Sequence, residues 1–112
     1  MADVNEQFGF VQQMLAAHFG KQPDLNAILF LIGMNELGKL RTKFTKEQKQ
    51  DLMHVAVCKL LSSEGIYRFA FKDDDGWPHY ERTDKLEHLT LAEQEELLKR
   101  NIVRYFEQNE LI

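Results

Sequence analysis

Two side chains able to act as a nucleophile or as metal ligands, His54 and Cys58, lie four residues apart, and Asp51 stands one turn earlier. Residues three or four apart share one face of a helix, so these groups would adjoin. A thiolate beside an imidazole is the start of a cysteine nucleophile or of a metal site. We favour the simpler interpretation, a part-buried cysteine and a histidine bonded to a neighbour, because no cysteine-protease signature surrounds Cys58.

Glu36 is a carboxylate in an unexpected position. It shares one side of a predicted helix with Leu25, Leu29 and Ile32, and the apolar side of a helix is an unusual place for a charge. One hypothesis is therefore a cleft that binds a small molecule or a metal ion and that could be catalytic. Its residues would be Glu36, His54, Cys58 and His79.

The segment 75–81 has the most unusual composition in the chain, since it brings Trp, His, Tyr and two carboxylates into a turn region. Loops carry function more often than cores do, and Trp and Tyr are favoured anchors at interfaces. The alternative is that Trp77 and Tyr80 only hold a hairpin against the helices. The predicted binding surface consists of Asp75, Trp77, His79, Tyr80 and Glu81.

An acidic run that ends at Gly76 invites comparison with an EF-hand calcium loop. With Gly76 at the invariant glycine, Asp73 and Asp75 fall at ligand positions three and five, but positions one and twelve become Phe71 and Arg82, which cannot bind calcium. The chain also lacks the glycine-rich nucleotide loops, the zinc motifs and the serine-hydrolase motif. We therefore expect no metal and no cofactor, and we favour a non-enzymatic role while leaving catalysis open.

Helical periodicity and capping signals divide most of the chain into four helices. Thr45 with Gln48, and Thr90 with Glu93, have the spacing of capping boxes, and Asp24 is a typical N-cap residue. The expected helices cover residues 4–19, 25–39, 46–63 and 91–108. The second of these is apolar on all sides, which is typical of a central, buried helix.

The remaining regular segment reads as a hairpin. Residues 66–72 are β-branched and aromatic, which predicts a strand, and the Asp-Gly pair at 75–76 is usual in hairpin turns. The return strand at 77–82 contains Pro78 and should lie at an edge. The sequence thus predicts a mainly α fold, with about four helices in a compact bundle and one small β-hairpin between helices three and four, in a single domain spanning residues 1–112.

Composition and charge limit the classes of partner. The net charge is −4, which argues against nucleic-acid binding despite a basic stretch at 39–49. The longest apolar run, 27–32, is far below the roughly 18 residues that span a bilayer. A single cysteine and an acidic start without signal-peptide character favour a soluble protein in a reducing compartment, so we expect a cytoplasmic location and no membrane association.

Two stretches, LNAILFLIG at 25–33 and DGWPH at 75–79, resemble short bacterial families of conserved hypothetical proteins. This resemblance implies no activity and assigns no functional residue. The residues themselves favour a protein-interaction module. If the other helices and the hairpin are too few to cover the apolar residues of helix 25–39 and of the hairpin, we expect a homodimer, with a different protein as a further possible partner. The alternative is a compact monomer in which the hairpin folds back over this helix and leaves no apolar surplus.

Overall fold

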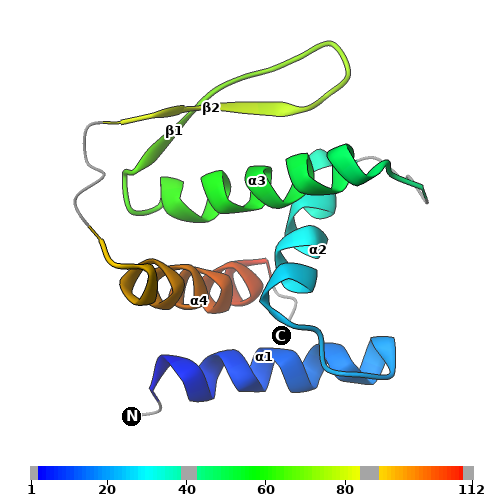
Figure 1. The fold of residues 1–112 in the computed structure, drawn as a ribbon, viewed down its shortest axis with the longest axis vertical. Helices are drawn as coiled ribbons and strands as arrows, with labels where there is room; N and C mark the ends of the chain where they lie inside the picture. The colour runs from blue at the N-terminus through cyan, green and yellow to red at the C-terminus, as the bar shows by residue number, and fades with distance from the viewer. Residues whose placement is uncertain (1–2, 39–42, 84–88, 110–112) are drawn as a thin grey trace.

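A computed structural model describes residues 3–38, 43–83 and 89–109, and it contains four helices and one hairpin (Figure 1). The predicted fold class is confirmed. The elements are α1 (Val4–Phe19), α2 (Leu25–Leu37), α3 (Lys46–Ser62), β1 (Tyr67–Lys72), β2 (Pro78–Arg82) and α4 (Leu91–Gln108). No helix in these ranges is long and apolar enough to cross a bilayer.

The helix starts lie where the capping residues place them. Asp24 accepts a hydrogen bond from the backbone N–H of Ala27 at 2.8 Å. Thr45 and Thr90 each form a complete capping box, in which the side chain three residues later bonds back to the cap. These bonds satisfy N–H groups that have no partner within the helix.

The end of α2 differs from the prediction. The helix stops at Leu37, because Gly38 adopts a left-handed conformation with φ of 71° and its N–H bonds the carbonyl of Met34. A left-handed residue at this position ends a helix, and glycine adopts that conformation without steric cost. The predicted end at Lys39 lies outside the described residues, as does part of the basic stretch 39–49.

The helices lie in layers on one side of the hairpin. Figure 1 shows the hairpin lying along α3, with α4 and then α1 on the opposite side of α3, and with α2 crossing between these layers. The largest fully buried side chains come from all four helices. They are Val11, Ile28, Ile32, Leu52 and Ile102.

The tightest crossing in the core joins α2 to α3 at Gly33. A Cβ atom at this position would lie 2.1 Å from the carbonyl oxygen of Leu52 and 2.7 Å from its carbonyl carbon. Real Cβ atoms essentially never come within 3.0 Å of such atoms. The absence of a side chain at Gly33 therefore sets how closely the two helices approach.

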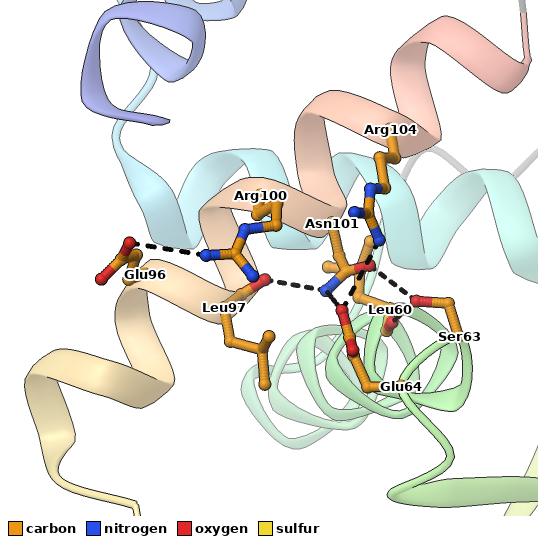
Figure 2. A network of polar contacts seen from close by, with 8 residues as sticks. All are labelled: Leu60, Ser63, Glu64, Glu96, Leu97, Arg100, Asn101 and Arg104. Carbon is orange, nitrogen blue, oxygen red and sulfur yellow. Dashed lines mark hydrogen bonds and ion pairs between the residues drawn. The ribbon is translucent and has the colours of Figure 1, made fainter. Parts of the chain in front are cut away.

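A buried polar residue, Asn101, ties α4 to the end of α3 (Figure 2). Its Nδ2 donates to Glu64 Oε1 at 3.0 Å and to the carbonyl of Leu97 at 2.9 Å, while its Oδ1 accepts from the Ser63 hydroxyl at 2.6 Å. Arg104 adds an ion pair with Glu64 at 3.6 Å. Since Asn101 is only 3% exposed, these contacts fix the register of the two helices.

The hairpin contains a bulge that separates its aromatic side chains. Phe69 pairs with Tyr80, but Phe71 pairs with His79, so Ala70 is an extra residue in β1. Successive residues of β2 point to opposite faces of the sheet. The bulge therefore places Phe69 and Phe71 on opposite faces of the hairpin.

Candidate functional site

The predicted binding surface at the hairpin divides into exposed and packed members. Asp75, His79 and Glu81 are exposed, whereas Trp77 and Tyr80 are half-buried. The alternative considered for these two aromatics, that they hold the hairpin against the helices, accounts for their burial. Among the five predicted residues, Asp75, His79 and Glu81 are therefore the ones that a partner could contact.

The acidic turn is held together by Asp73. Its Oδ1 accepts from the N–H groups of Asp75 and Trp77, both at 3.0 Å, and its Oδ2 lies 2.9 Å from His79 Nε2. The hydrogen bond from His79 and those from the backbone hold the pKa of the Asp73 carboxyl below its usual range. The Asp73 carboxylate therefore stabilises the turn, which gives this member of the acidic run a structural role.

Two aromatic residues that the sequence did not single out as a binding surface are the exposed large apolar side chains of the hairpin. Phe69 is 51% exposed and Phe71 is 54% exposed. The Phe71 ring stacks on His79 with centroids 4.6 Å apart and an interplanar angle of 8°. On the opposite face, Phe69 meets Tyr80 edge to face at 5.8 Å. The aromatic residues of β1 are evident in the sequence, but only the bulge at Ala70 shows that Phe69 and Phe71 lie on opposite faces of the hairpin.

The helical pair His54 and Cys58 does meet, as the four-residue spacing predicts. Cys58 Sγ lies 3.5 Å from His54 Nε2, and the His54 ring packs edge to face on Tyr67. Cys58 is 2% exposed, and burial raises the pKa of its thiol to about 11. An activated cysteine has a lowered pKa and partial exposure, so this environment is the reverse of that of a nucleophile.

A hollow of about 420 Å³ lies between the first half of α3 and the tip of the hairpin. It brings together His54 and His79, together with Asp51 and Asp73. Four potential metal ligands thus line one hollow. Within residues 3–38, 43–83 and 89–109, however, no three His, Cys, Asp or Glu side chains are grouped so that they could hold a metal ion.

Glu36 lies in a different hollow and has a clear structural partner. Its Oε2 accepts a hydrogen bond from the Tyr105 hydroxyl at 2.8 Å, and Asn35 donates to the same hydroxyl. Lys59 Nζ lies 4.0 Å from Oε1. Burial is the main reason that the pKa of Tyr105 is raised, so the phenol stays protonated and donates. These contacts explain why a carboxylate occupies the apolar side of α2.

The four residues of the predicted cleft therefore do not meet in one hollow. His54 and His79 line the smaller one, Glu36 lines a larger one of about 660 Å³, and Cys58 lies in the core. Pro78 lines both hollows. Burial, and then the charges of Glu36 and Cys58, raise the pKa of Tyr80, which lines the larger hollow, to about 12.

Comparisons with known proteins were made by family, by sequence and by structure. No family model matches the chain, and no curated protein or solved structure is similar to it. The resemblance to short bacterial conserved hypothetical proteins stays a prediction. The geometry of the described residues is thus the basis for any assignment of function.

Proposed function

We propose that this chain is a protein-interaction module that uses the hairpin face carrying Arg68, Phe71, His79 and Glu81, and that its partner is a second copy of itself. The observation that carries the proposal is Phe71, a large apolar side chain that is 54% exposed. It belongs to a hairpin whose main contacts with the helices are all with α3. Aromatic side chains are enriched at interfaces and dominate their binding energy.

The neighbours of Phe71 support a self-complementary contact. Register places Arg68 opposite Glu81, and Phe71 opposite His79, on the same face of the hairpin. The Arg68 guanidinium lies 2.7 Å from the Glu81 carboxylate, and both side chains are largely exposed. This face therefore carries a flat aromatic centre beside one positive and one negative group.

A two-fold dimer can use such a face twice. In an isologous interface the same patch meets itself, so Arg68 of one protomer would face the partner subunit's Glu81. The stacked Phe71 and His79 rings would be covered at the centre. Because a two-stranded hairpin is only marginally stable by itself, such packing would also stabilise it.

The proposal includes a reducing, cytoplasmic location. The only cysteine of the chain, Cys58, is buried and free, which is usual for proteins that are not exposed to oxidising conditions. The acidic net charge of −4 disfavours nucleic acid as the partner.

Light scattering during size-exclusion chromatography tests the proposed dimer. We expect a mass near twice 13.2 kDa for the wild type at micromolar concentration, and a return to the monomer mass for Phe71→Ser. Phe10→Ser is the matched control, because Phe10 on α1 is also 54% exposed. A wild-type mass of 13.2 kDa throughout, or dissociation by Phe10→Ser and not by Phe71→Ser, would contradict the proposal.

A further inference from the structure

The hollow that Glu36 lines lies between helices α2 and α3 and the hairpin face that carries Phe69 and Tyr80. Its volume of about 660 Å³ falls within the roughly 300–1,000 Å³ of typical small-molecule sites. Of the four residues that define the proposed dimer face, only Arg68 also lines this hollow. An inference about this hollow therefore does not rest on the proposed dimer.

One wall of the hollow is aromatic and incompletely covered. Tyr67, Phe69 and Tyr80 all line it, and the strand register places them on one face of the hairpin. Half of the Phe69 side chain is exposed, although it lies in a concave part of the surface. A planar ring lying in the hollow would cover this apolar area and pack against the Phe69–Tyr80 pair.

The charges around the hollow favour an anion. Three cationic side chains line it, against the single carboxylate of Glu36. Arg68 is paired with Glu81, and Lys59 approaches Glu36 to 4.0 Å. Lys72 has no carboxylate partner among the residues that the structure describes. A positive hollow in a chain of net charge −4 would attract negative ligands locally.

Tyr80 adds a hydrogen-bonding group to the aromatic wall. Its hydroxyl has no hydrogen-bond partner within residues 3–38, 43–83 and 89–109. Burial and the nearby Glu36 charge raise the pKa of this phenol to about 12, so it remains protonated at neutral pH. It can therefore donate to an oxygen of a bound ligand.

We infer that this hollow binds a small aromatic anion. The ring lies against Phe69 and Tyr80, and the carboxylate, sulfonate or phosphate group is held by the rim lysines, Lys72 and Lys59. Glu36 does not contact the anion, because its Oε2 is bound by Tyr105. It instead keeps Lys59 at the rim of the hollow.

Fluorescence titration with two probes tests this inference. The first probe is 8-anilinonaphthalene-1-sulfonate, an aromatic sulfonate, and the second is N-phenyl-1-naphthylamine, which has the same rings without the charge. We expect saturable binding of one sulfonate probe per chain. Phe69→Ala should weaken both probes by at least about fivefold, since it removes apolar contact area. Lys72→Gln should weaken only the sulfonate, by up to about fivefold, as expected for one exposed ion pair.

Two matched controls separate this site from general surface binding. Phe10→Ala and Lys46→Gln change exposed residues outside the hollow, so they should leave both affinities unchanged. Near-UV circular dichroism of each variant excludes a molten state, which also binds the sulfonate probe. Absence of saturable binding, or equal weakening by Phe10→Ala and Phe69→Ala, would overturn the site. Insensitivity of the sulfonate to both Lys72→Gln and Lys59→Gln would overturn the anionic class of ligand.

Discussion

Replacing Gly33 by alanine should destabilise the protein because α2 and α3 touch at this position. The new Cβ would lie 2.1 Å from the Leu52 carbonyl oxygen, so the helices would have to separate by about an ångström. The atom in the way belongs to the backbone and cannot move as a flexible side chain could. Both helices also carry fully buried core residues, Ile32 and Leu52, whose packing would change together.

The size of this effect follows from two opposing contributions. Overpacking a core typically costs ~1–3 kcal/mol, and the rigid backbone contact places Gly33→Ala at the upper end. Alanine is favoured over glycine within a helix by ~1 kcal/mol. We therefore expect a net loss of about 2 kcal/mol in the free energy of unfolding. In a chain of this size, this corresponds to a fall in Tm of roughly 8 °C.

Gly9 provides the matched control in another helix. It lies within α1, and a Cβ at this position would meet nothing within 4 Å. Gly9→Ala should therefore raise the free energy of unfolding by about 0.5–1 kcal/mol through helix propensity alone.

Urea unfolding followed by far-UV circular dichroism measures both variants, with an unchanged m value as the sign that only stability has changed. If Gly33→Ala were as stable as the wild type or more so, the close crossing of α2 and α3 would be refuted.

Three further substitutions test the core, the polar network and the thiol. Leu29→Asp should abolish the helical circular dichroism signal, because Leu29 is 5% exposed and an unpaired buried carboxylate costs several kcal/mol; near-native melting would contradict this. Asn101→Asp puts a second carboxylate beside Glu64, which lies 3.0 Å from the Asn101 amide, so the pKa of the new buried group should be raised in the folded state. Its stability relative to Asn101→Leu should then be greatest below the unfolded-state pKa of about 4 and fall as the pH rises from there through the raised pKa of the folded state. Equal pH profiles of the two variants' urea midpoints would disprove the repulsion. Cys58→Ser should keep the fold. In the wild type, the Cys58 thiol, whose pKa is raised to about 11, should react with a disulfide reagent at neutral pH far more slowly in the folded protein than in the protein unfolded by urea. Equal rates would show that the thiol is accessible in the folded protein.

Local signals made much of the fold predictable. The starts of α3 and α4 depend on Thr45 and Thr90, whose capping boxes bond residues only three positions apart. Helix α1 was predicted with its observed bounds, since Asp3 and Gly20 cap its two ends. Such signals act within a few residues and do not require knowledge of the tertiary structure.

The contacts that build the site could not be read from such local patterns. The bond between Glu36 and Tyr105 joins residues 69 positions apart, and neither residue type specifies the other. The bulge at Ala70 is likewise invisible to a period-two pattern, although it decides which face carries Phe71. The sequence indicated that Glu36 is an unusual charge on an apolar helix side and that the hairpin has an unusual composition. Only the packing shows that Glu36 lines one hollow while His54 and His79 line another.

Mixing two charge-reversed variants tests the proposed hairpin interface most directly. In Arg68→Glu both hairpin charges are negative, and in Glu81→Arg both are positive, so neither variant should associate with itself. If the hairpin faces that carry Phe71 pack about a two-fold axis, an equimolar mixture should form a heterodimer with a light-scattering mass near twice 13.2 kDa, because each charge then meets its opposite across the interface. Rescue within one chain cannot explain that result. A mixture that remains monomeric, or single variants that still dimerise, would contradict the hairpin as the contact surface.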